Sequence, residues 1–132
     1  MRKASYQVPG ASADAEPGEL AVFHFGRDQG GSIEANVDRW AMQFPNVDRK
    51  SVKQSQRNTK GLVQHIVEIE EGTFSSGMPG GPSAPKTGWA LLGAIVEGPD
   101  GNWFFKLTGP RATVGAARSE FFTMLDGVEA TP

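Results

Sequence analysis

Cysteine is absent from this chain of 132 residues, which excludes disulfides and thiolate metal sites. A strong net charge is lacking as well. The formal charge of −2 gives no general attraction to nucleic acid or to anionic membrane surfaces. No apolar run approaches the ~20 residues that a membrane-spanning helix needs. We therefore expect no nucleic-acid partner and no transmembrane segment.

Signatures of catalysis are scarce too. No Gly-x-Ser-x-Gly nucleophile elbow occurs, and the chain has only two histidines, His24 and His65, each within an expected strand. The two histidines would bind a metal if neighbouring strands brought them together with Glu68 or Glu70. Without a His-x-His or His-x₃-His spacing, a structural role is favoured. We expect no catalytic or metal-binding residues, and an enzyme is the least favoured class.

Two glycine-rich segments share some features with phosphate-binding loops. Residues 26–32 join an expected strand to an expected helix, so their N–H groups could hold an anion, but they lack the three-glycine dinucleotide spacing. Residues 80–87 are superficially similar to a Walker A loop. Pro85 stands there at a glycine position and removes an N–H group, and an expected strand follows instead of a helix. We therefore expect no cofactor.

The strongest structural signal is the apolar block near the C-terminus. Residues 89–96 form a nearly unbroken apolar run, which stops at a Pro-Asp-Gly turn and resumes at residues 103–107. This pattern predicts two strands joined by a tight turn. The first strand is apolar on both faces and should be central in its sheet. Phe104 and Phe105 point to opposite faces, so both faces should be covered.

Two amphipathic helices accompany the strands. The first has Ser32 as a candidate N-cap and ends at Pro45, and the second begins near Thr113 and has Gly127 just beyond it. Each has one apolar stripe that should pack on a sheet. The stripes are Ile33, Val37, Trp40, Ala41 and Phe44 in the first helix, and Val114, Ala117, Phe121 and Leu125 in the second.

The whole pattern predicts one domain over residues 1–132, of the α+β class. Further strands are expected at residues 4–8, 19–25 and 62–69, and one face of the last should be more buried than the other. Residues 1–18 are a partly extended N-terminal segment, and the basic run 48–60 is an exposed strand or loop. Strands joined by short turns favour a mainly antiparallel sheet, covered by the two helices as a sandwich.

Several blocks resemble a bacterial family of small, often exported, uncharacterised proteins. They are residues 30–44, 91–96, 104–110 and 113–114. Members of that family are similar in fold to the photosystem II protein PsbP and to the yeast Ran-binding nucleotide-release factor. The resemblance implies a PsbP-like α/β/α sandwich with a curved antiparallel sheet, and it implies no activity. It also favours a periplasmic or extracellular protein whose leader is absent from this chain, with a cytoplasmic protein as the alternative.

Two places could bind a partner. One is the basic run, which could contact nucleic acid, a membrane surface or an acidic partner. It has no interleaved aromatic residue for base stacking, so a solvated face is favoured. The other is the Gly/Pro-rich loop at 72–88, whose apolar residues must pack back or contact a partner. The candidate residues are Arg49, Lys50, Lys53, Arg57, Phe74 and Met78. We expect a non-catalytic binding or accessory module that acts through protein–protein interaction, or a small-ligand or metal-binding protein with a pocket near residues 72–88.

Overall fold

The computed structural model describes residues 2–10, 16–26, 32–75, 86–98 and 101–128, and these form an α+β fold. In chain order the elements are β1 (Arg2–Val8), β2 (Gly18–Gly26), α1 (Ile33–Met42), the short 3₁₀ helix η1 (Arg49–Ser51), β3 (Lys53–Thr59), β4 (Leu62–Phe74), β5 (Lys86–Gly98), β6 (Gly101–Pro110) and α2 (Arg111–Asp126). The expected order of two strands, a helix, several strands and a final helix is confirmed.

One six-stranded sheet has the order β1-β2-β6-β5-β4-β3, and all five neighbouring pairs are antiparallel. The expected central strand, β5, lies between β6 and β4. The β5–β6 hairpin closes with Gly98 opposite Gly101, as the Pro-Asp-Gly turn predicts. At the far edge, the β3–β4 hairpin turns through Lys60 and Gly61, both at positive φ, which suits the twist of a two-residue hairpin turn.

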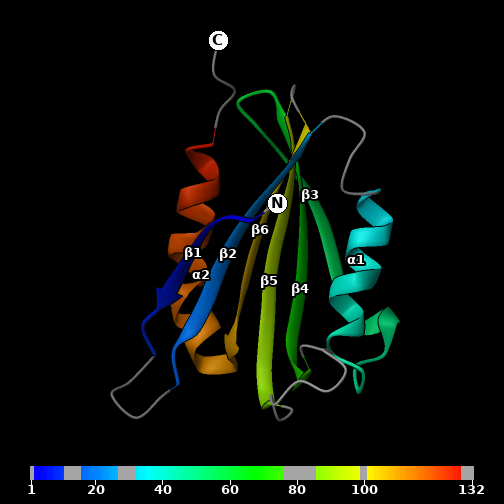
Figure 1. Cartoon of the computed structure of the whole chain (residues 1–132), viewed down its shortest axis with the longest axis vertical. Coiled ribbons are helices and arrows are strands. Elements are labelled where there is room, and N and C mark those ends of the chain that lie inside the picture. The colour runs from blue at the N-terminus through cyan, green and yellow to red at the C-terminus, as the bar shows by residue number, and fades with distance from the viewer. Residues whose placement is uncertain (1, 11–15, 27–31, 76–85, 99–100, 129–132) are drawn as a thin grey trace.

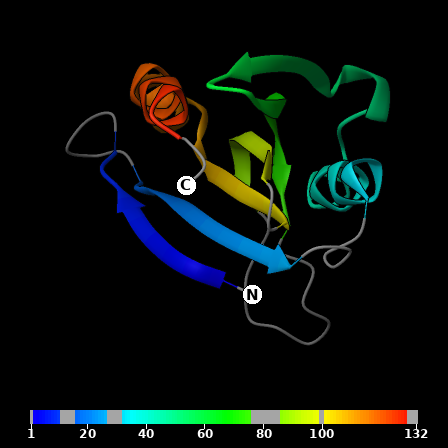
Figure 2. The same ribbon diagram turned by 90° about the horizontal axis from the view of Figure 1, so that it is seen from above.

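The two helices cover opposite faces of the sheet (Figure 1). Seen from above, the sheet curves toward α2, while α1 packs on its other side (Figure 2). Alternation of side chains along each strand divides the core into two parts. Phe105 belongs to the cluster under α2, and Phe104 to the cluster under α1, so the expectation that both faces are covered is confirmed.

The sheet holds α1 in place through a close contact between Trp40 and Gly93. Trp40 is 5% exposed, and its indole lies edge-on to Phe104 with ring centroids 6.3 Å apart. A Cβ atom on Gly93 would lie 2.4 Å from Cζ3 of the indole, so only glycine leaves room for the ring. As the helical stripe predicts, Trp40 is buried and Asp38 is exposed.

Several expected boundaries differ from those observed. Helix α1 ends at Met42, and Phe44 lies beyond it. Phe44 precedes Pro45, and the proline ring disfavours helical backbone in the residue before it. Helix α2 begins at Arg111, directly after β6. The expected 72–88 loop is shorter at both ends, because β4 continues to Phe74 and β5 starts at Lys86. Residues 76–85 lie outside those described.

The expected difference in burial between the two faces of residues 62–69 is small, and both faces contain buried residues. On the α2 side, Leu62, Gln64 and Ile66 are buried. On the α1 side, Val67 and Ile69 are buried. Strand β4 lies inside the sheet and has a helix over each face, so its sequence alternation does not separate core from solvent. Among the described residues, no helix is long and apolar enough to cross a membrane.

Candidate functional site

A groove lies between α2 and the sheet, with a volume of about 320 Å³. We call it the α2 groove. Its floor includes Ala90, Leu92 and Val114, all buried in the core cluster under α2. Its charged residues come from three elements: Lys53 of β3, Glu68 and Glu70 of β4, and Arg111 and Arg118 of α2. An apolar floor with a few polar groups around it is the usual composition of a small-ligand site.

Two ion pairs join α2 to β4 at this groove, and of their four residues only Glu71 does not line it. Arg118 contacts Oε1 of Glu68 through Nε at 3.0 Å and Nη2 at 2.9 Å. Arg111 approaches Glu71 less closely, with Nη1 3.8 Å from Oε1, which is too long for a hydrogen bond. The two arginines are two helical turns apart, about 10 Å along the axis. The first pair is therefore firm and the second is loose.

A third ion pair, Lys53 with Glu70, belongs to the wall formed by β3 and β4. Its hydrogen bond, and then the attraction of the opposite charges, raises the pKa of Lys53 and lowers the pKa of Glu70. Both groups therefore keep their charges over a wider pH range than they would alone. The charges on this wall are fixed features of the groove at neutral pH.

The β4 wall is irregular where its carboxylates gather. The register between β4 and β5 shifts between Ile69 and Gly72, as at a β-bulge. Glu70 and Glu71 lie at this shift and pair with Lys53 and Arg111. A bulge changes the direction of side chains along a strand and is frequent next to binding sites. Here two successive carboxylates pair with cations that line the groove, although only Glu70 of the two lines it directly.

Gly115 forms part of the α2 wall, midway between the two arginines. Glycine within a helix costs about 0.5–1 kcal/mol relative to alanine. At position 115 no atom lies within 4 Å of an added Cβ, so packing does not require glycine there. Glycine at this position makes the helix less stable, and it leaves the groove wider than alanine would, because the methyl group of alanine would project into this open space.

Beyond the groove, a second group of contacts fixes α2 and Arg118. Two guanidinium groups lie over the Phe122 ring, with Cζ of Arg57 5.1 Å and Cζ of Arg118 4.8 Å from its centroid. Gln64 is fully buried and donates from Nε2 to the Leu125 carbonyl at 2.9 Å. Arg57 also pairs with Asp126 and donates to Oε1 of Gln64. The position of Arg118 is therefore set by both Glu68 and Phe122.

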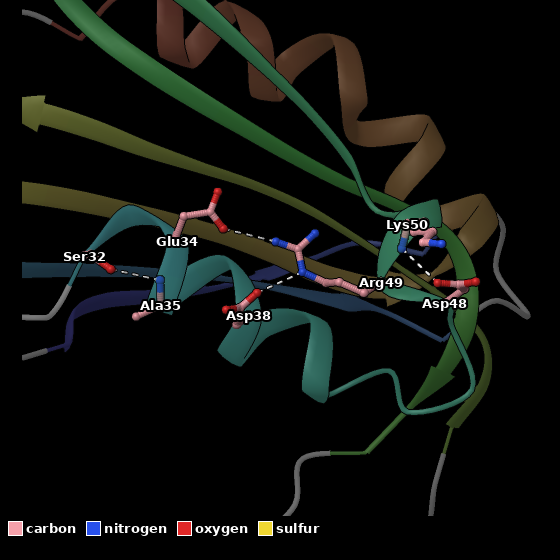
Figure 3. A network of polar contacts seen from close by, with 7 residues as sticks. All are labelled: Ser32, Glu34, Ala35, Asp38, Asp48, Arg49 and Lys50. Atoms are coloured by element: carbon pink, nitrogen blue, oxygen red, sulfur yellow. Dashed lines mark hydrogen bonds and ion pairs between the residues drawn. The ribbon is translucent and has the colours of Figure 1, made fainter.

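The structure does not bring the four basic candidates together as one patch. Arg49 of η1 turns toward α1, where it pairs with Asp38 at 2.9 Å and Glu34 at 3.4 Å (Figure 3). Lys50 is exposed, and its backbone N–H donates to the side chain of Asp48 (Figure 3). The 3₁₀ turn therefore separates Arg49 and Lys50 from the basic residues of β3, and a partner-binding role of the four residues stays a prediction.

The other two basic candidates, Lys53 and Arg57, share the α2 side of β3. They stand opposite Glu68 and Gln64 of β4 in the strand register. Lys53 lines the α2 groove, and Arg57 lies beside Phe122 and Asp126 at the far end of the helix. Of the residues that the basic run indicated, Lys53 alone lines this groove. The sequence pattern did not indicate Arg111, Arg118 or Gly115, although a glycine inside an expected helix is unfavourable and was a signal for Gly115.

Phe74 packs back onto the body of the protein, one of the two alternatives for this residue. Its ring stacks on Trp89 at 5.3 Å with an interplanar angle of 13°, and contacts Phe44 at 5.4 Å. The other loop candidate, Met78, lies outside the described residues. The pocket expected near residues 72–88 stays a prediction, since the middle of that segment is not described.

The two histidines lie on opposite faces of the sheet. The His24 ring packs against Trp103 with centroids 4.4 Å apart and an interplanar angle of 31°, in the half of the core under α2. His65 stands opposite Ile95, on the α1 side, and its Nε2 lies 2.7 Å from Oε2 of Glu97. The metal site that would have joined them is therefore not formed. Within the described ranges, no group of three or more His, Asp or Glu residues is arranged to hold a metal ion.

An apolar hollow of about 480 Å³ lies at the C-terminal end of α1. It is lined by Asp38, Ala41, Met42, Phe44, Pro45, Val47 and Arg49. Met42 is 77% exposed, which is unusual for a long apolar side chain on a helix that packs on a sheet. This surface, the Met42 hollow, is separate from the α2 groove because it belongs to the other face of the sheet.

No family model and no curated protein matches the chain. Among solved structures, it is similar to PA94 from Pseudomonas aeruginosa, a protein of unknown function described as a candidate regulator. The TM-score is 0.65 and the identity 12%, over 98% of this chain and 83% of that chain. At this identity the likeness shows the fold alone. The resemblance to the exported bacterial family and to PsbP stays a prediction.

Proposed function

We propose that this protein is a non-catalytic binding module and that the α2 groove is its binding site. The observation that carries the proposal is the combination of an apolar floor with ion pairs that link α2 to β4 beside it. Burial of apolar surface supplies affinity in such a site, and the charged groups select the orientation of what binds. The groove walls consist of paired Lys, Arg and Glu residues with apolar side chains, and the histidines lie elsewhere, which supports binding over catalysis.

The unfavourable effect of Gly115 on the stability of helix α2 also supports the proposal. A helix of 16 residues would gain from alanine at this position, and the space to accept it is present. Proteins often carry locally unfavourable residues where a binding surface requires them. Glycine at position 115 has this character, because its effect is to leave the wall of the groove open.

A fragment screen by NMR tests the site directly. With ¹⁵N-labelled protein, we expect small amphiphilic fragments to shift the amide signals of Leu92, Val114 and Gly115 together. Gly115→Gln should remove these shifts, because its side chain occupies the groove without unfavourable helix propensity. Ala116→Gln adds a similar side chain at an exposed position of the same helix and should leave them unchanged.

Two outcomes of the screen would contradict the proposal. Fragments that shift signals scattered over the surface, with none concentrated at the groove, would show that the groove is not a preferred site. Equal loss of binding in Gly115→Gln and Ala116→Gln would show that the helix as a whole responds to substitution. Thermal unfolding of both variants shows whether they are folded, so a loss of binding that is caused by unfolding can be recognised.

We also propose a second candidate function, protein–protein interaction through the Met42 hollow. The exposed Met42 side chain carries this candidate, because methionine adapts its shape to partner surfaces. The apolar hollow beside it is bordered by Asp38 and Arg49, which resembles the apolar centre and polar rim of interfaces. The location of the protein, within or outside the cytoplasm, would decide which partners are accessible.

Photo-crosslinking from position 42 tests this second candidate. A photoreactive residue at position 42 should join one dominant protein in the native cell. The same residue at Glu120, an exposed position of α2, is the matched control. The same crosslinked products from both positions would indicate random encounters and would remove the case for the hollow.

A further inference from the structure

The charges around the α2 groove balance each other. Three cations line the groove, Arg111, Arg118 and Lys53, and each has a glutamate partner. Glu68 and Glu70 line the groove as well, and Glu71 lies beside it as the partner of Arg111. A simple anion would have to compete with the glutamates for the arginines and the lysine. A simple cation would have to compete with the arginines and the lysine for the glutamates. The arrangement is therefore complementary to a molecule that carries both charges close together.

One of the three pairs is open to such a molecule. Glu68 already accepts two contacts from Arg118, and the Phe122 ring also holds that guanidinium. The Arg111–Glu71 pair has its nearest atoms 3.8 Å apart, and both side chains are more than half exposed. The donors of Arg111 and the acceptors of Glu71 can therefore turn to new partners at little cost.

We propose that the α2 groove binds a free zwitterionic amino acid with an aliphatic side chain, an inference that rests on the proposed function of the groove. The carboxylate would contact Arg111, and the ammonium group would contact Glu71. The aliphatic side chain would lie on the floor of Ala90, Leu92 and Val114, beneath the open wall at Gly115. A volume of about 320 Å³ is at the lower end of small-ligand sites and suits a molecule of this size.

The test uses L-leucine and two analogues that each lack one charge. N-acetyl-L-leucine keeps the carboxylate, and L-leucinamide keeps the ammonium group. We expect L-leucine to shift the amide signals of Val114 and Gly115 with a dissociation constant on the order of 1 mM. Each analogue should bind about two- to fivefold more weakly, since exposed charge contacts contribute little individually. Added salt should narrow these differences.

Two charge variants assign the roles of the pair. In Glu71→Gln, L-leucine should bind no better than N-acetyl-L-leucine, because the ammonium partner is gone. In Arg111→Gln, L-leucine should bind no better than L-leucinamide. Arg39→Gln changes a charge at an exposed position of α1, on the other face of the sheet, and is the matched control, in which the preference for L-leucine should persist.

Failure of this inference can be told apart from failure of the proposed function. If fragments bind in the groove but L-leucine binds no better than both analogues, the zwitterion is the wrong ligand class and the groove remains a binding site. A preference for L-leucine that survives in both Glu71→Gln and Arg111→Gln would also overturn the inference. If no fragment concentrates at the groove, both proposals are wrong.

Discussion

The contact between Trp40 and Gly93 makes Gly93→Ala a sharp test of the fold. Glycine within a strand is unfavourable for backbone entropy, so alanine at an unobstructed site would raise stability by about 0.5–1 kcal/mol. At position 93 the added methyl group would lie 2.4 Å from Cζ3, 3.0 Å from Cε3 and 3.1 Å from Cη2 of the indole. Three overlaps with one rigid ring cannot be relieved by rotating a flexible chain end.

The expected magnitude follows from how little room the indole has. Trp40 is 5% exposed and is held edge-on to Phe104, so it must shift together with α1. Overpacking of a dense core typically costs about 1–3 kcal/mol. We expect Gly93→Ala to lower the free energy of unfolding by about this amount, and Gly115→Ala, which meets no atom within 4 Å, to raise it by about 0.5–1 kcal/mol.

Urea unfolding followed by far-UV circular dichroism measures both changes without relying on tryptophan fluorescence. A double-mutant cycle with Trp40→Phe then isolates the contact, because the smaller ring removes the overlapping atoms. In that background Gly93→Ala should be close to neutral, which corresponds to a coupling of about 1–3 kcal/mol. An equal effect of Gly93→Ala in both backgrounds would show that Trp40 does not lie on Gly93, and the placement of α1 would be wrong.

Three further predictions concern the core and the groove wall. Ile95→Ala removes a fully buried side chain from the central strand, and we expect denaturation to show a loss of about 2–5 kcal/mol; a loss below about 0.5 kcal/mol would refute a central position. Gln64→Leu leaves the buried Leu125 carbonyl without the donor on Nε2, which should cost about 1–3 kcal/mol and increase hydrogen exchange in the last turn of α2; unchanged exchange would contradict this anchor. The Lys53 hydrogen bond lowers the pKa of Glu70, so the stability that this pair contributes is present above the pKa of the carboxylate in the unfolded chain and is lost as the pH falls through its pKa in the folded protein. In Lys53→Gln, ¹³C NMR should show that Glu70 titrates at a higher pH than in the unchanged protein. Equal titration in the two proteins would refute the pairing.

The elements that could be predicted are those with strong local signals. Ser32 caps α1 as expected, accepting a hydrogen bond from the backbone N–H of Ala35 at 3.1 Å. The apolar run and its Pro-Asp-Gly turn predicted the β5–β6 hairpin, whose register closes at Gly98 and Gly101. The order of helices and strands along the chain was also readable. In each case, residues close together in the sequence decide the outcome.

The local sequence gives no sign of an environment that comes from distant parts of the chain. The alternation in residues 62–69 does not show that the polar Gln64 is buried, and it is buried because α2, some 60 residues later, covers it. The basic run looked continuous, yet the 3₁₀ turn at Arg49–Ser51 directs its halves to different helices. Neither periodicity nor composition contains information on which helix will cover which face.

The sequence by itself determined the fold class, two amphipathic helices, a central apolar hairpin and the absence of cysteine chemistry. Periodicity, capping residues and turn residues act over a few positions, so a single segment is enough to reveal them. Only the tertiary structure decided the strand order and the α2 groove, whose walls combine β3, β4 and α2. The Arg118–Glu68 pair joins residues 50 positions apart, and such contacts depend on how the whole sheet curves around the helix.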